Sequence, residues 1–124
     1  MNVLCVDQDR TKLRQMKRDA KEIVPDARFA ACRDPSRAER LAREKGCDVL
    51  LTNTVFDGSN WDGMILARKI QSVCPRANII FIADRADTSA AYGTWQIGAS
   101  AFLLRSYEKR RLAKALANPR FASE

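Results

Sequence analysis

Short apolar runs alternate with longer amphipathic stretches along the whole chain, and this alternation limits the folds open to it. Apolar and β-branched residues over four to six positions are typical of buried strands. The runs cover residues 2–6, 27–32, 48–53, 78–83 and 101–104. Because each run is followed by a helix-like stretch and a short connection, we expect an α/β fold with a parallel sheet and right-handed crossovers.

The amphipathic stretches carry the expected helix boundaries. Asp9 and Asp34 precede apolar-periodic segments as N-caps, and Pro35 suits the first helical position. The expected helices cover about residues 10–24, 35–45, 62–74, 90–97 and 108–117. Five strand–helix units favour a (βα)5 flavodoxin-like, doubly wound sheet in the order 2-1-3-4-5. We expect a single domain over residues 1–118 and a tail over 119–124.

Composition narrows the functional classes. The 124 residues suffice for one core, and no apolar run approaches the roughly 20 residues of a membrane span. The start of the chain lacks a signal-peptide layout, so we expect a cytoplasmic protein. The four cysteines are scattered singly and there is no histidine, which excludes the usual zinc sites and catalytic triads.

The chain is basic, with 22 Lys and Arg against 15 Asp and Glu and a formal net charge of +7. Such a charge attracts nucleic acid or acidic partners weakly. The basic residues are spread over surfaces of the expected helices, which also fits an ordinary solvated face.

Polar and small side chains follow the expected strands. Asp7 and Gln8 follow the first strand, Asn53 ends the third, Ala83 ends the fourth and Arg105 follows the fifth. In an open α/β sheet the carboxyl ends of the strands form the crevice that binds ligands. We expect these five residues to gather there.

Three segments carry a resemblance to a known family: DVLLTNTVFDGSNWDGMILARKI, NIIFIA and GASAFLLRSY. Their order and spacing resemble the response-regulator receiver domain of two-component systems, most closely the receivers that precede LytTR-type DNA-binding domains. The resemblance implies a phosphoacceptor aspartate that holds Mg²⁺ together with an acidic pair. It also implies a Thr or Ser and a Lys that bind the phosphoryl oxygens.

The residues depart from that pattern at four of these five positions. Asp7 keeps the first acidic position, but Gln8 replaces the second, and Asn53 replaces the phosphoacceptor. Ala83 replaces the hydroxyl residue and Arg105 replaces the lysine. We expect a degenerate pocket with no catalytic residue and no cofactor. Mg²⁺ binding should be weak or absent, with Asp7 the one candidate ligand, and Arg105 is expected to pair with Asp7.

The leading hypothesis that the resemblance implies is a pseudo-receiver, a regulatory module that is not an enzyme and acts by binding proteins rather than by accepting phosphate. The resemblance places its contact face on the helix at 90–97, the strand at 101–104 and the last helix. The candidate residues on this face are Tyr92, Trp95, Phe102, Tyr107 and Arg110. Partners would be another protein or a second copy, as a homodimer, with no membrane and only weak or indirect contact with nucleic acid. Trp95 and Tyr107 also fit ordinary packing.

Two alternatives stay open at this point. One is an atypical phosphoaccepting receiver that uses Asp57 or Asp7. Asp57 lies four residues past Asn53, so this would require the strand to continue through Thr54. The other is a nucleic-acid-binding module that uses the basic surface. No DNA-binding module is recognisable in these residues, so we expect any such output to come from a partner or another region.

Overall fold

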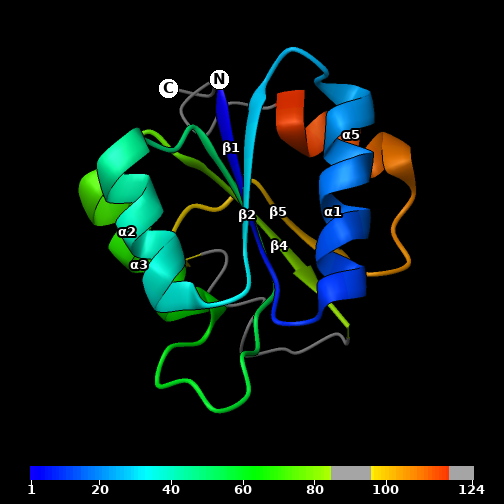
Figure 1. Cartoon of the computed structure of the whole chain (residues 1–124). Helices are drawn as coiled ribbons and strands as arrows, with labels where there is room; N and C mark the ends of the chain where they lie inside the picture. The colour runs from blue at the N-terminus through cyan, green and yellow to red at the C-terminus, as the bar shows by residue number, and fades with distance from the viewer. Residues whose placement is uncertain (85–95, 118–124) are drawn as a thin grey trace.

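The computed structural model describes residues 1–84 and 96–117. Its strands form one parallel sheet in the order β2-β1-β3-β4-β5 (Figure 1). The strands are β1 (Asn2–Val6), β2 (Arg28–Cys32), β3 (Val49–Thr52), β4 (Asn78–Ala83) and β5 (Ala101–Leu104). The predicted fold class and strand order are confirmed. The third strand is shorter at both ends than the expected 48–53.

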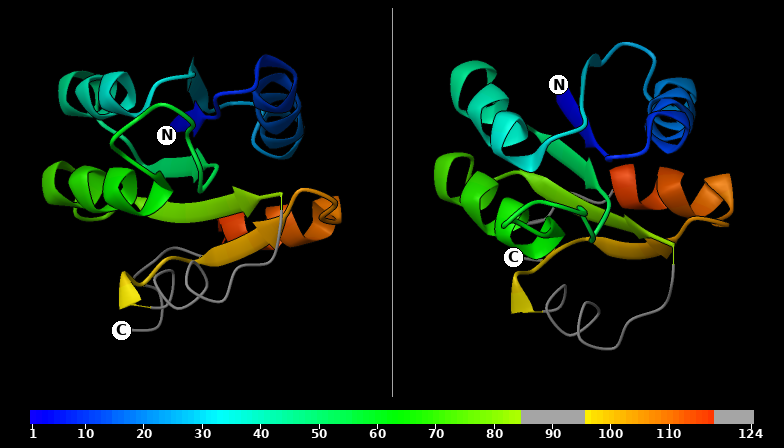
Figure 2. Two further views of the ribbon diagram at one scale, coloured as in Figure 1. Left: turned by 90° about the horizontal axis from the view of Figure 1, so that it is seen from below. Right: turned by 60° about the horizontal axis from the view of Figure 1, so that its bottom comes forward.

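Helices cover both faces of the sheet. They are α1 (Arg10–Ile23), α2 (Pro35–Lys45), α3 (Gly63–Val73) and α5 (Lys109–Ala117). Helices α1 and α5 lie on one face, and α2 and α3 lie on the other (Figures 1 and 2). The helix expected at 90–97 falls almost wholly outside the described residues. None of the described helices is long and apolar enough to span a bilayer.

Side-chain caps fix where the helices begin. The carboxylate of Asp9 accepts the backbone N–H of Lys12, and that of Asp34 accepts the backbone N–H of Arg37. Each bond satisfies a backbone donor that the first turn of a helix leaves free. Asp62 caps α3 in the same way. The caps at Asp9 and Asp34 were predicted, and Pro35 is the first residue of α2.

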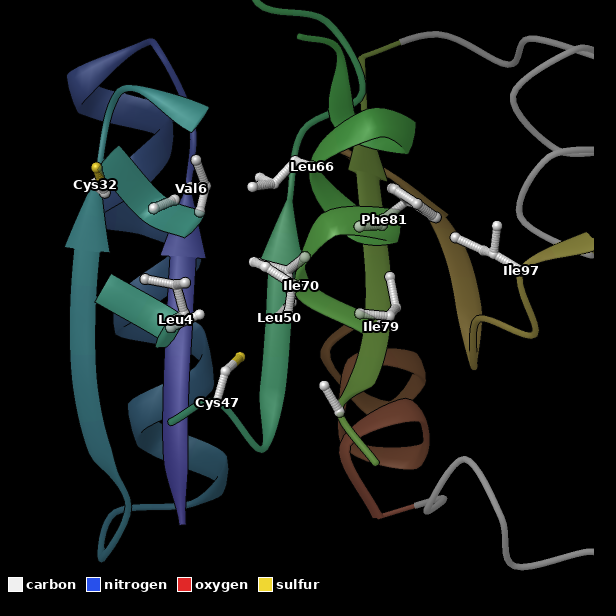
Figure 3. Close-up of a cluster of buried hydrophobic side chains, with 14 of the residues drawn as sticks. Leu4, Val6, Cys32, Cys47, Leu50, Leu66, Ile70, Ile79, Phe81 and Ile97 are labelled. Atoms are coloured by element: carbon white, nitrogen blue, oxygen red, sulfur yellow. The ribbon is translucent and has the colours of Figure 1, made fainter. Parts of the chain in front are cut away.

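Strand β4 joins the two halves of the core, since all six of its residues are buried. Ile79 and Phe81 pack into the cluster under α2 and α3 (Figure 3), while Ile80 and Ile82 pack into the cluster under α1 and α5. A strand covered on both faces reads as a continuous apolar run, because neither face meets water. This explains the sequence NIIFIA.

The strand register brings the polar strand ends together. Val6 pairs with Thr52, and Thr52 pairs with Phe81 across the next ladder. The backbone N–H of Asn53 donates to the carbonyl of Val6 at 3.1 Å. Asn53 therefore lies directly beside the end of β1, at the edge where Asp7 begins the next loop.

Candidate functional site

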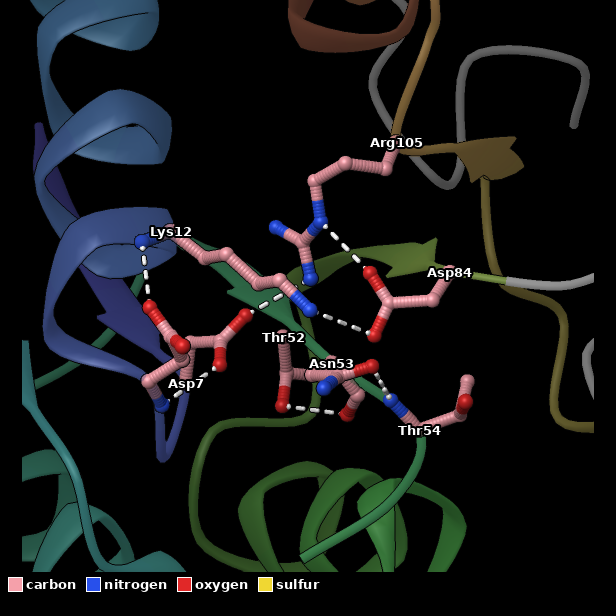
Figure 4. Close-up of polar contacts among 8 residues, drawn as sticks. Asp7, Lys12, Thr52, Asn53, Thr54, Asp84 and Arg105 are labelled. Carbon is pink, nitrogen blue, oxygen red and sulfur yellow. Dashed lines mark hydrogen bonds and ion pairs between the residues drawn. The ribbon is translucent and has the colours of Figure 1, made fainter.

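Asp7 is a buried carboxylate with both oxygens engaged. Only 1% of the surface of Asp7 is exposed to solvent. Oδ1 accepts the backbone N–H of Asp9 at 2.9 Å, and Oδ2 accepts Nη2 of Arg105 at 2.8 Å (Figure 4). A buried charge is tolerated only when it is paired and hydrogen-bonded. The ion pair expected between Asp7 and Arg105 is present.

Arg105 connects Asp7 to a second carboxylate. Its side chain is 18% exposed, and its Nε donates to Oδ1 of Asp84 at 3.0 Å. Oδ2 of Asp84 pairs in turn with Nζ of Lys12 at 3.0 Å. Figure 4 shows these four groups bridging the strand ends between α1 and β5. Cations and carboxylates alternate along this row, which we call the charge row: Asp7, Arg105, Asp84 and Lys12.

The charge row perturbs the titration of Asp84. Partial desolvation opposes ionisation, but the hydrogen bonds and charges of Lys12 and Arg105 outweigh it, so the pKa of Asp84 lies below its usual value. Sequence reasoning did not identify Asp84 and Lys12. The available signal was their position, one directly after β4 and the other in the first turn of α1.

Asn53 directly follows β3, and its side chain forms a hydrogen bond to the backbone of the next residue. It is 7% exposed, and its Oδ1 accepts the backbone N–H of Thr54 at 2.8 Å. The hydroxyl of Thr52 donates to the Asn53 carbonyl at 2.9 Å. These bonds hold the chain where it leaves the sheet. An amide carries no negative charge and is a poor nucleophile, so Asn53 does not supply the nucleophilic carboxylate to which a phosphoryl group would be transferred.

Gln8 fastens the loop after β1 to the loop after β3. Its Nε2 donates to the carbonyl of Asp57 at 2.6 Å, and its Oε1 accepts the backbone N–H of Asp57 at 2.9 Å. Both polar atoms of the amide are therefore used in pairing with the backbone, as in a strand ladder. We call this pair of bonds the Gln8 clasp. Sequence reasoning treated Gln8 only as a missing metal ligand, because a contact across 49 residues leaves no local pattern.

Asp57 lies in the loop rather than on the strand. Strand β3 ends at Thr52, so the longer strand through Thr54 that an acceptor role for Asp57 would require does not form. The residue is exposed, and its backbone is held by the Gln8 clasp. Nothing places its carboxylate next to Asp7 or Arg105 among the described contacts.

Gly63 brings α3 against the end of β3. A Cβ built on Gly63 would lie 2.3 Å from the carbonyl oxygen of Asn53 and 2.8 Å from the Cα of Thr54. The backbone N–H of Gly63 donates to the carbonyl of Thr54 at 2.9 Å. The absence of a side chain thus lets the two backbones meet, which is a common use of glycine beside a functional strand end.

Ala83 and Phe102 lie on the neighbouring strands β4 and β5. Ala83 is buried at the end of β4, and its methyl offers no hydrogen bond to the crevice. Phe102 is half-buried and its ring centroid lies 6.4 Å from that of Phe81. Trp61 packs on the core under α3, with Nζ of Lys69 4.6 Å from its ring centroid.

The expected contact face is described only in part, because Tyr92 and Trp95 lie outside the described residues. Tyr107 is half-buried and its hydroxyl donates to Oδ2 of Asp19 on α1 at 2.5 Å. Burial first, and then this carboxylate, raises the pKa of Tyr107. Arg110 is 81% exposed and pairs with Glu108. Tyr107 thus contributes to packing of α5 on α1, while Arg110 stays available at the surface.

A parallel sheet in this order, with polar side chains gathered at its carboxyl edge, defines the flavodoxin-like class of α/β proteins. The family model for the response regulator receiver domain matches residues 3–117. The chain therefore belongs to the response regulator receiver family. A search of curated proteins found no match.

Solved structures agree with the family at the level of the fold. A receiver domain protein from Clostridium thermocellum has a TM-score of 0.80 at 20% identity, over 93% of this chain and 90% of that one. The receiver domain of the putative response regulator NarL from Mycobacterium tuberculosis has a TM-score of 0.76 at 22% identity, over 93% and 91%. RcsB from Salmonella enterica, solved on promoter DNA, has a TM-score of 0.78 at 20% identity, over 94% and 66%.

The Mg²⁺ ion that the family implies does not fit the residues present. Magnesium is bound through carboxylates and water oxygens in near-octahedral geometry. Here both oxygens of Asp7 are engaged, and one of them holds a guanidinium that would repel a dication. Within the described residues, no three His, Cys, Asp or Glu side chains are gathered as metal ligands.

Proposed function

We propose that this chain is a pseudo-receiver: a receiver domain that accepts no phosphoryl group at Asn53 and regulates through protein contacts that need no phosphorylation. One observation carries the proposal. The buried carboxylate of Asp7 is neutralised by Arg105 at 2.8 Å, a cation that belongs to the chain itself. In an ordinary receiver that carboxylate helps to hold an exchangeable metal ion.

The other substitutions act in the same direction. Asn53 supplies no acceptor carboxylate, and Ala83 supplies no hydroxyl for a phosphoryl oxygen. The Gln8 clasp ties the loop after β1 to the loop after β3. The charge of Asp7 is thus neutralised, the acceptor carboxylate is missing and the loop after β1 is held in place. The strand ends then have neither phosphorylation nor Mg²⁺ binding to shift the domain between two states.

A domain held in one state acts by what it contacts. The surface that remains for this role includes β5 and α5, with Arg110 exposed and Phe102 half-buried. A protein partner or a second copy of the chain would dock there. Association with a LytTR-type output domain remains a prediction. RcsB was solved on DNA, and any DNA contact of the present chain is proposed to be indirect or weak.

Incubation with acetyl phosphate and Mg²⁺, followed by intact-mass measurement, tests the proposal. We expect the mass to stay unchanged. The matched control is the variant Gln8→Asp/Asn53→Asp/Ala83→Thr/Arg105→Lys, which rebuilds the four altered positions and should gain one phosphoryl group. A labile gain on the natural chain would contradict the proposal. If Asp57→Asn or Asp7→Asn abolished that gain, the atypical acceptor would be established instead.

A salt titration addresses the nucleic-acid alternative. A module that neutralises several phosphates loses affinity steeply as salt rises, with a slope set by the number of contacts. We expect weak binding to random-sequence DNA with a shallow slope. Tight binding to random-sequence DNA, with an affinity that falls steeply as the salt concentration rises, would favour the alternative.

A further inference from the structure

The outer edge of β2 is bordered by a groove that the receiver function does not use. Strand β2 is the last strand on its side of the sheet, paired only with β1. A cavity of about 460 Å³ lies along its carboxyl half, lined from α1 on one face of the sheet and from α2 on the other. A second cavity of about 480 Å³ along its first half shares Leu41 with the first. In Figure 1, β2 is the foremost strand, between α1 and α2.

Cations surround the first cavity, which we call the β2 groove. Its basic lining residues are Arg10, Arg14, Lys17, Arg33 and Arg37. One carboxylate, Asp34, lies among them, and it already caps α2. Within residues 1–84 and 96–117, the ion pairs involve none of these five cations. Nε of Arg33 donates to the carbonyl of Gln8 at 2.9 Å. Much of the excess positive charge of the chain is therefore gathered on one edge without an ion-pair partner among the described residues.

The floor of the groove offers apolar contacts and main-chain groups. The side chains of Leu13, Ala31, Cys32 and Leu41 line it. Arg28 donates its backbone N–H to the carbonyl of Met1, and the Cys32 carbonyl accepts from Asp7. In a parallel ladder alternate residues point both groups to the same neighbour. The N–H and C=O groups of Phe29 and Ala31 therefore point outward, away from β1.

We infer that the β2 groove binds an acidic, extended segment of a partner protein as an added strand. Outward main-chain groups pair with the backbone of such a segment, and alternate side chains meet the apolar floor. Carboxylates on the other positions meet the groove cations. This binding is independent of phosphate at the crevice, so it goes beyond the pseudo-receiver proposal and does not rest on it.

The same observations argue against other occupants. A second copy would bring an equally cationic edge against this one, and like charges repel. Nucleic acid would use the cations, but recognition of single strands also draws on aromatic stacking. The residues lining the β2 groove include no aromatic side chain, and the adjoining cavity adds only Phe29, so successive bases would have no row of rings to stack on. An acidic peptide uses all three features: charge, apolar floor and open backbone.

The test uses a short fluorescent peptide of alternating Glu and Val, with binding followed by anisotropy. The double charge reversal Arg14→Glu/Arg37→Glu should weaken binding about tenfold or more at about 0.1 M salt, because close like charges oppose docking. The matched control is Arg68→Glu/Arg76→Glu, which changes the net charge equally at two exposed residues outside the groove. It should change the affinity by no more than about threefold.

Strand pairing has its own readout. Hydrogen exchange at the amides of Phe29 and Ala31 should slow when the peptide binds, and the same peptide N-methylated at alternate residues should bind much more weakly. These measurements use the natural chain, so they decide the question even if a charge reversal impairs folding. Unchanged exchange, equal loss in both charge-reversal variants, or no binding of the Glu-Val peptide would overturn the inference. Tighter binding of a random oligonucleotide, lost in Arg14→Glu/Arg37→Glu, would assign the groove to nucleic acid and also overturn it.

Discussion

Arg105 reaches from the end of β5 to the buried carboxylate of Asp7 at the end of β1, across a separation of 98 residues. Strands β3 and β4 lie between them in the sheet. The ion pair therefore crosses the carboxyl edge of the sheet and links the end of β5 to the end of β1. Because Asp7 is almost fully buried, this bond matters more for stability than a surface pair would.

Replacing Arg105 should lower the free energy of unfolding, because Asp7 would remain buried without a partner. Arg105→Met leaves Asp7 charged without its partner, and we expect a loss of about 2 to 4 kcal/mol of unfolding free energy, since breaking a buried pair strands a charge. Urea unfolding measures it. The control Arg110→Met breaks an exposed pair and should cost less than about 0.5 kcal/mol. In the double variant Asp7→Asn/Arg105→Met part of the loss should return; equal losses in the single and double variants would show that the pair does not couple.

Removing the Gln8 clasp should loosen one loop and leave the core intact. Gln8→Ala deletes two hydrogen bonds to Asp57, and we expect about 1 kcal/mol of global destabilisation because each net bond contributes modestly. Amide exchange at Asp57 should rise by a larger factor than exchange in β4. Gln15→Ala, at an exposed position on α1, is the control and should alter neither quantity. Unchanged exchange at Asp57 would show that the clasp does not hold the loop.

Gly63 and Gly58 should respond differently to alanine. Gly63→Ala drives a Cβ into the backbone at Asn53, and we expect a loss of about 3 kcal/mol or more, since a backbone neighbour cannot yield easily. Gly58 has φ of 75° but open space around it, so Gly58→Ala should cost only about 1 kcal/mol of backbone strain. Thermal unfolding compares the two. Similar losses would mean that the approach of α3 to β3 is not tight.

The charge row should make stability depend on acidity through Asp84. Its pKa in the folded chain lies below the ordinary 3.8, so its stabilising contribution is complete above that pH and is lost as the pH falls further. Asp84 is half-exposed, so we expect Asp84→Asn to cost only about 0.5 to 1 kcal/mol at neutral pH. The difference from the natural chain should persist at mildly acidic pH and vanish in stronger acid. A difference that grew on acidification would contradict the assigned sign.

Local patterns predicted much of the fold, because strands, caps and crossovers are encoded over a few neighbouring residues. Asp9, Asp34 and Pro35 mark helix starts, and the run at 78–83 marks the central strand. The ion pair of Asp7 with Arg105 followed from strand order together with complementary charge.

The remaining parts of the site could not be predicted because they depend on how loops fold over the crevice. The Gln8 clasp joins a side chain to a backbone 49 residues away, and no spacing rule encodes it. Asp84 looked like an ordinary loop residue until Arg105 and Lys12 were placed around it. Tyr107 was considered equally for contact and for packing, and only the position of Asp19 shows where its hydroxyl goes.

The dependence of stability on Mg²⁺ tests the central claim most directly. A magnesium site with a dissociation constant of about 1 mM would add about 1.4 kcal/mol at about 10 mM Mg²⁺. At matched ionic strength, we predict a gain below about 0.3 kcal/mol for the natural chain, because Arg105 holds Asp7. Asn53→Asp should respond slightly, and Gln8→Asp/Asn53→Asp/Arg105→Lys clearly. A gain of about 1 kcal/mol or more in the natural chain would mean that the crevice still binds a metal ion, and would contradict the claim.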